Sequence, residues 1–172
     1  MKSTKNLALG GLLIALVTIG TMTINVPMPA TNGYINIGDS MIFMIAILFG
    51  SRFGLLAGGI GSALADIFLG YTHWALPTLI IKGLEGFIVG KIAVEKTSES
   101  SFEIRDIIAV LVGGTWMVAG YYLGGAILKG SWLAPLDSVG GNIIQAIGGG
   151  VIAYPIIFAI LKTSIVKVIK EN

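Results

Sequence analysis

Four ionisable side chains lie within stretches that are otherwise apolar, namely Asp39, Asp66, Lys82 and Glu85. Lys82 and Glu85 are three residues apart, so a helix would place them on one face. Ionisable groups are costly inside a bilayer and usually face the interior of a helix bundle. The set could form a buried ion-pair network that fixes helix register, a ligand site or, as a weaker alternative, a proton relay. Asp39 begins its predicted helix, where N-terminal capping and compensation of the helix dipole are the simpler role.

Polar and aromatic residues in the last two apolar stretches could bind a neutral ring. Asn142 and Gln145 are also three residues apart, and each amide offers two donors and two acceptors. They suit the edge of a heterocycle, or equally a hydrogen bond between helices. In the preceding stretch Trp116 lies near the middle and Tyr121 near the outer end. There Tyr121 could stack on a ligand or belong to the interfacial aromatic belt.

The composition places these residues in a membrane rather than in a water-soluble domain. Hydrophobic residues make up 55% of the 172 and charged residues 12%, about half of what a soluble domain carries. This excludes an ordinary soluble enzyme, a disordered chain and a coiled coil, and the length fits one domain, residues 1–172. The sequence has no cysteine and a single histidine, His73, and it shows no phosphate-binding loop and no nucleophile–base pair. We therefore predict no metal, cofactor or catalytic site and no nucleic-acid partner.

Four apolar stretches are long enough to cross a bilayer, which takes about 20 residues. They are Leu7–Val26, Ala75–Ile92, Ile107–Leu128 and Val139–Leu161. The first is too long for the core of a signal peptide and is interpreted as a retained helix. Residues 35–70 could form one helix, Met41–Gly61, or two shorter helices that turn at Gly50–Gly54.

The positions of the basic residues favour two helices there, and six in all. Both termini are then cytoplasmic, and nine of the eleven lysines and arginines lie on the cytoplasmic side, where such residues collect. With a single helix, Arg52 would sit inside the membrane, which is costly. We therefore predict an all-α bundle of six transmembrane helices in the cell membrane. The second helix would be short, and tilted or shielded by its neighbours, and Pro27–Ile37 would form a loop over the outer mouth.

The first predicted helix carries a stripe of small residues, Ala8, Gly11 and Ala15. In lipid, such a stripe lets another helix approach closely. The approaching helix could belong to the same bundle or to a partner protein.

Four motifs, in this order, resemble those of the substrate-binding S components of energy-coupling factor (ECF) transporters. They are Tyr34-Ile35-Asn36-Ile37-Gly38-Asp39, Gly58-Gly59-Ile60-Gly61-Ser62-Ala63-Leu64-Ala65-Asp66, His73-Trp74-Ala75-Leu76-Pro77 and Ile81-Lys82-Gly83-Leu84-Glu85-Gly86. The resemblance covers nearly the whole chain and is closest to the branch that holds the riboflavin and hydroxymethylpyrimidine/pyridoxine-type proteins.

The resemblance implies how such a protein works. It implies six helices, capture of a vitamin near the outer face, and a transmembrane T component with two cytoplasmic ATPase subunits as partners. It also implies that the first helix contacts the T component through an Ala-x-x-x-Ala pair. Here Gly11 replaces the first alanine and keeps the small size.

The buried residues favour a small ring as the substrate. A polyanion would need several buried cations, and only Lys82 is available, so we expect a hydroxymethylpyrimidine- or pyridoxine-like compound, with riboflavin second. The alternative is a standalone proton-coupled carrier or channel, although the chain lacks the internal repeat typical of carriers. The predicted substrate-binding residues are Tyr34, Asn36, Asp66, Lys82, Glu85, Trp116, Tyr121, Asn142 and Gln145, and the predicted partner-binding residues are Ala8, Gly11 and Ala15.

Overall fold

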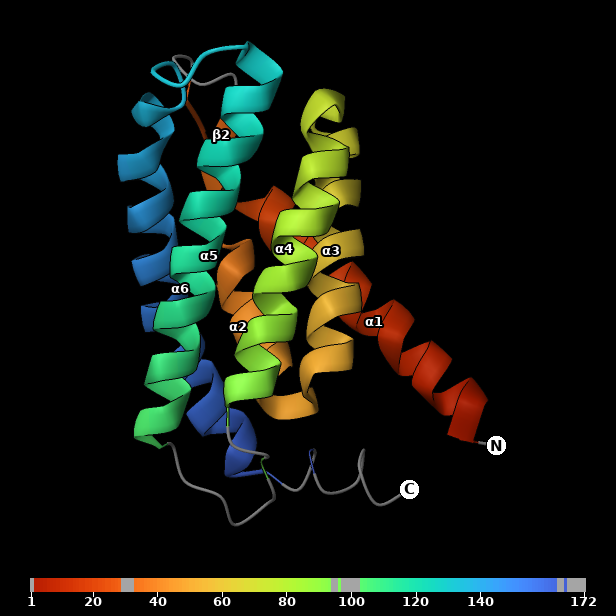
Figure 1. Ribbon diagram of the computed structural model, residues 1–172. Helices are drawn as coiled ribbons and strands as arrows, with labels where there is room; N and C mark the ends of the chain where they lie inside the picture. The colour runs from red at the N-terminus through yellow and green to blue at the C-terminus, as the bar shows by residue number, and fades with distance from the viewer. Residues whose placement is uncertain (1, 29–32, 94–95, 97–102, 164–165, 167–172) are drawn as a thin grey trace.

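The computed structural model describes residues 2–28, 33–93, 96, 103–163 and 166, and these are almost entirely helical (Figure 1). Three helices, α1, α5 and α6, are long and apolar enough to cross a membrane. The elements are, in chain order, α1 (Lys2–Thr23), β1 (Asn25–Met28), β2 (Gly33–Asn36), α2 (Gly38–Phe49), α3 (Ser51–Phe68), α4 (Thr72–Ile92), α5 (Ile104–Lys129) and α6 (Leu136–Leu161).

Two helices, not one, follow the first outer segment, as predicted, and the chain turns between them at Gly50. Gly50 has φ +85° and ψ 178°, a conformation that only glycine adopts readily. Its N–H donates to Ala46 at 3.0 Å and closes α2, while its carbonyl accepts from Gly54 at 3.0 Å and opens α3. A continuous helix over Met41–Gly61 is therefore excluded.

Helix α2 lies at the centre of the bundle. Its 12 residues rise about 18 Å, well short of the ~30 Å hydrocarbon core. Ten of the twelve are buried, and Figure 1 shows the helix enclosed by its longer neighbours. Phe43, Ile45 and Leu48 are fully buried and form the core with residues of α1, α4, α5 and α6. Neighbouring helices therefore shield the short helix.

Helices α3 and α4 approach each other through glycines. A Cβ atom on Gly58 would lie 2.6 Å from the Lys82 carbonyl oxygen, and one on Gly59 would lie 2.7 Å from that of Leu79. Gly54 and Gly86 face each other's backbone in the same way. Such close contact between backbones is how small residues stabilise helix pairs in lipid.

The segment predicted as an irregular outer loop is instead a β-hairpin. Strands β1 and β2 are antiparallel, with Asn25 opposite Asn36 and Pro27 opposite Tyr34. The preceding helix ends at Thr23, before the predicted Val26. One reason is that Pro27 disfavours a helical conformation at the residue before it. Residues 29–32 of the predicted loop lie outside the described residues.

Helices α4, α5 and α6 each begin three residues earlier than predicted, at Thr72, Ile104 and Leu136. Polar and cap-forming residues make up much of these first turns, so a prediction that follows only the apolar stretches leaves them out. At α5 the Glu103 side chain and Asp106 form a reciprocal capping box, which satisfies backbone N–H groups at the helix start. His73 and Trp74 consequently lie in the first turn of α4 rather than in a loop.

Candidate functional site

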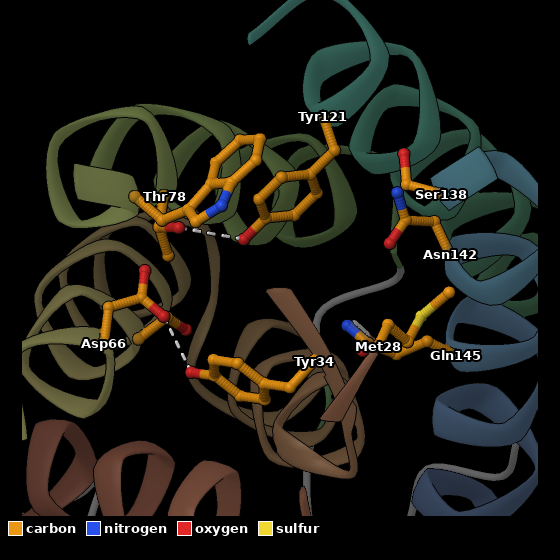
Figure 2. A pocket seen from close by; sticks show the side chains of 10 residues that line it. Met28, Tyr34, Asp66, Thr78, Tyr121, Ser138, Asn142 and Gln145 are labelled. Carbon is orange, nitrogen blue, oxygen red and sulfur yellow. Dashed lines mark hydrogen bonds between the residues drawn. The ribbon is translucent and has the colours of Figure 1, made fainter. Parts of the chain in front are cut away.

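A pocket opens at the hairpin end of the bundle, where strands β1 and β2 meet helices α3 to α6 (Figure 2). Its cavity of about 60 Å³ has room for a few water molecules. A vitamin-sized ring would therefore have to displace side chains at its walls. The lining residues are Met28, Tyr34, Ser62, Asp66, Trp74, Thr78, Tyr121, Ser138, Asn142 and Gln145.

Asp66 of α3 and Tyr34 of β2 meet at one wall of the pocket. The Tyr34 hydroxyl donates to Asp66 Oδ1 at 2.7 Å. Burial, and then the adjacent negative charge of Asp66, raise the pKa of Tyr34 well above its ordinary value, so the phenol remains a donor at physiological pH. The Asp66 side chain is 4% exposed, and its other oxygen, Oδ2, has no hydrogen-bond partner among the described residues.

Aromatic rings form the walls between the polar groups. The rings of Trp74 and Tyr121 are 5.7 Å apart and inclined at 64°, and the Tyr121 hydroxyl lies 3.1 Å from Thr78 Oγ1. The Tyr34 ring lies 4.8 Å from that of Tyr71. Rings at these separations already contact each other, so a flat heterocycle can pack against their outer faces.

Amide side chains of α6 form the opposite wall. Gln145 is held at both ends of its amide, because its Oε1 accepts from the Asn36 backbone N–H at 2.8 Å while its Nε2 donates to Asp39 at 3.3 Å. Asn142 makes no side-chain hydrogen bond to the described residues, and Figure 2 shows its amide across the pocket from Asp66. The Asn142 amide therefore retains its full capacity to bind a polar edge.

A buried ion-pair network lies next to the pocket. Lys82 forms ion pairs with Asp39 and with Glu85, the second at 3.0 Å, and all three side chains are at most 2% exposed. The Asp39 side chain makes no capping hydrogen bond, so the predicted capping role is wrong, although its carboxylate lies in the first turn of α2, where a negative charge compensates the helix dipole. The carboxylate binds Lys82 and Gln145. The network therefore joins α2, α4 and α6 around a single ammonium group.

The structure brings five of the predicted substrate-binding residues together in the pocket wall. The other four lie elsewhere: Lys82 and Glu85 belong to the network, the Asn36 side chain accepts from the Gly38 N–H at 2.8 Å, and the Trp116 indole donates to the Ile81 carbonyl at 3.0 Å. The five are Tyr34, Asp66, Tyr121, Asn142 and Gln145.

Five lining residues were not among the predicted site residues. For two of them a signal exists, because Trp74 and Thr78 lie on the same helix face as Lys82, at four-residue spacing. Trp74 lines the pocket, although a tryptophan at the end of a span is more simply expected in the aromatic belt. The residues are Met28, Ser62, Trp74, Thr78 and Ser138.

The small-residue stripe on α1 faces away from the rest of the bundle. Ala8, Gly11 and Ala15 are all exposed, and a Cβ atom on Gly11 would contact nothing within 4 Å. Leu13 and Val17, on the other face of the helix, are buried in the core. Figure 1 shows the N-terminal half of α1 leaning away from the other helices, so a partner could reach the stripe.

Comparison with known proteins identifies the family. The family model described as "ECF-type riboflavin transporter, S component" matches residues 1–162. The chain belongs to this family. It is therefore a multi-pass membrane protein of a vitamin transport system, and the family is one of transporter components rather than enzymes.

Curated relatives extend this comparison. An uncharacterized protein of Pyrococcus woesei is 43% identical over 136 residues, which cover 79% of this chain and 88% of that protein. The thiamine precursor transporter HmpT of Lactococcus lactis subsp. cremoris is 29% identical over 154 residues, which cover 88% of this chain and 85% of that protein. A UPF0397 protein of Streptococcus pneumoniae serotype 19F is 35% identical over 86 residues, which cover 49% of this chain and 47% of that protein.

Proposed function

We propose that this chain is the vitamin-binding S component of an ATP-driven ECF transporter. Its substrate would be a small heteroaromatic vitamin or precursor of the hydroxymethylpyrimidine or pyridoxine type, with riboflavin second. The observation that carries this proposal is the pocket of Figure 2, where aromatic faces lie between a carboxylate and two amides. Flat apolar faces with polar groups at the edges match such a ring. The relative HmpT, a thiamine precursor transporter, supports the same choice.

We propose six membrane spans with both termini in the cytoplasm. The alternating direction of the helices brings the basic residues at five helix ends to the end of the bundle opposite the pocket, whereas Lys129 lies at the pocket end. This distribution supports a cytoplasmic location for the end of the bundle opposite the pocket. The pocket would then open to the outside of the cell. The five residues are Lys5, Arg52, Lys91, Arg105 and Lys162. Two of the nine basic residues predicted on the cytoplasmic side, Lys167 and Lys170, lie outside the described residues.

Binding without autonomous transport follows from the packed interior. Beyond the pocket, α2 fills the centre of the bundle with fully buried side chains such as Phe43, Ile45 and Leu48. We therefore expect the chain to hold its vitamin and to need a partner to release it inside. The proposed partners are a transmembrane T component and two cytoplasmic ATPase subunits, and the proposed docking surface is the exposed stripe of Ala8, Gly11 and Ala15.

Identification of a co-purified ligand tests this proposal. The protein is purified from cells grown in rich medium, and the small molecules it retains are released and identified by mass spectrometry. We expect one heteroaromatic vitamin or precursor in near-stoichiometric amount. A preparation that retains no such compound, and binds none when hydroxymethylpyrimidine, pyridoxine and riboflavin are added, would contradict the proposal.

A further inference from the structure

The Asp66 carboxylate is only half satisfied. Tyr34 donates to Oδ1 at 2.7 Å, whereas Oδ2 has no hydrogen-bond partner among the described residues, although Asp66 is only 4% exposed. The neighbouring Thr78 hydroxyl forms its hydrogen bond with Tyr121, at 3.1 Å. A buried carboxylate oxygen without a donor is unfavourable by more than an ordinary missing hydrogen bond. Because Asp66 lines the pocket, the missing donor can come from a ligand.

The charge of the pocket restricts that ligand further. Of the ten described residues that line it, one is anionic and none is cationic. Lys82 forms ion pairs with Asp39 and Glu85, so its single positive charge is already shared between two other carboxylates. A phosphate or carboxylate on the ligand would therefore meet a buried negative charge with no compensating cation among the lining residues.

We propose that the pocket selects an amino-substituted nitrogen heterocycle, whose exocyclic N–H donates to Asp66 Oδ2. The ring lies among Tyr34, Trp74 and Tyr121, and its far edge binds the Asn142 amide. This inference rests on the proposed function and narrows it. It favours an aminopyrimidine over pyridoxine and riboflavin, and it excludes phosphorylated forms of the same compound.

Tyr34 makes the selection testable by substitution, because it fixes the orientation of whatever side chain stands at position 66. In Asp66→Asn, the amide oxygen is the only acceptor for the Tyr34 hydroxyl, so the NH₂ group takes the place of Oδ2. A donor then faces the ligand where an acceptor stood. The substitution should therefore reject an amine and tolerate a carbonyl at the same ring position.

The experiment measures binding to the purified full-length chain by titration calorimetry. The probes are the amino-bearing hydroxymethylpyrimidine, its oxo analogue with a carbonyl oxygen in place of the amine, and the phosphate ester of the amino compound. We expect the wild type to prefer the amino compound over the oxo analogue by about 10- to 100-fold, as for one hydrogen bond to a charged group, and not to bind the ester. In Asp66→Asn the preference should disappear or invert. Asp137→Asn is the matched control, because it makes the same change at an exposed carboxylate that does not line the pocket, and it should keep the preference.

Two results would overturn the inference: equal affinity of the wild type for the amino and oxo compounds, or an unchanged preference in Asp66→Asn. If the substituted protein does not fold, the wild-type comparison still decides. A wild type that binds pyridoxine or riboflavin but not the amino compound refutes this inference and leaves the proposed function standing. A wild type that binds no vitamin refutes both.

Discussion

Lys82 supplies the positive charge that compensates two buried carboxylates. Its ammonium lies between Asp39 and Glu85, and no donor other than Lys82 approaches Glu85 among the described residues. Burying an ion costs several kcal/mol in lost hydration, and a pair or triad offsets this only while it is complete. The network therefore fixes the relative positions of α2 and α4 through one side chain.

Replacing Lys82 by methionine should lower the free energy of unfolding by about 3–5 kcal/mol, because two carboxylates would remain buried without a cation. Thermal unfolding in detergent measures this. The triple variant with Asp39→Asn and Glu85→Gln keeps the shapes, removes the charges and should recover much of the loss. A Lys82→Met protein that melts at the wild-type temperature would show that the ion pairs are not structural.

Asn142→Ala should act on binding alone. The amide lines the pocket and makes no side-chain hydrogen bond to the described residues, so its removal leaves no protein group unsatisfied. We expect ligand affinity to fall by about 1–3 kcal/mol, the value of a buried hydrogen bond, with an unchanged melting temperature of the ligand-free protein. Unchanged affinity would remove Asn142 from the site.

Residue types in the sequence could predict half of the residues that line the pocket but could not predict which of the remaining candidates lie there. Asp66, Asn142 and Gln145 stand out because polar groups are rare in apolar spans. The choice between Trp74 and Trp116 could not be predicted, because it depends on which helix faces each ring. The Trp116 indole meets the Ile81 carbonyl across the α4–α5 contact, and a single helix pattern does not reveal that neighbour.

At the scale of the elements, the glycine contact between α3 and α4 positions the site. Asp66 stands on α3, and Trp74 and Thr78 stand on α4, so the distance between these two helices sets the width of one side of the pocket. The contact has room only for hydrogen at Gly58, where a Cβ atom would lie 2.6 Å from the Lys82 carbonyl oxygen.

Gly58→Val should therefore separate α3 from α4 and lower the free energy of unfolding by about 1–3 kcal/mol, as for overpacking in a core. Ligand affinity should fall as well, because the pocket wall moves. Gly148→Ala on α6 is the matched control, since a Cβ atom there contacts nothing within 4 Å, and alanine favours a helix over glycine by about 1 kcal/mol. Equal stability of the two variants would contradict the packing account.

Helices were predictable from the sequence and the hairpin was not. The break at Gly50 could be predicted because Arg52 is too costly to place inside a span. Strands β1 and β2 have four residues each, and β1 contains Pro27, so neither carries a periodic pattern long enough to indicate a strand. Their pairing brings Tyr34 to Asp66, which local sequence signals do not specify.

At the scale of the whole molecule, the pocket and the small-residue stripe are separate surfaces. Gly11 lies on the exposed face of α1, and the pocket is built from the hairpin and helices α3 to α6. Capture of the vitamin and docking to a partner should therefore be separable by substitution.

Gly11→Leu should abolish uptake that depends on the T component and ATPase subunits while leaving vitamin affinity unchanged, because a large side chain prevents close approach of a partner helix. Uptake of radiolabelled vitamin by cells that express all subunits measures the first effect, and calorimetry measures the second. Gly148→Leu is the matched control at a glycine of α6 that is likewise open around its Cα. Equal loss of binding and uptake in Gly11→Leu would argue against a docking role.

The most direct test of the whole account is uptake into sealed vesicles that contain this chain as the only protein. The packed centre around α2 predicts that the chain binds its vitamin with saturation but accumulates none inside, with or without a proton gradient. Addition of the T component, both ATPase subunits and ATP should then start accumulation. Steady uptake by the chain alone, above all if it follows the proton gradient, would contradict the account and support a standalone carrier.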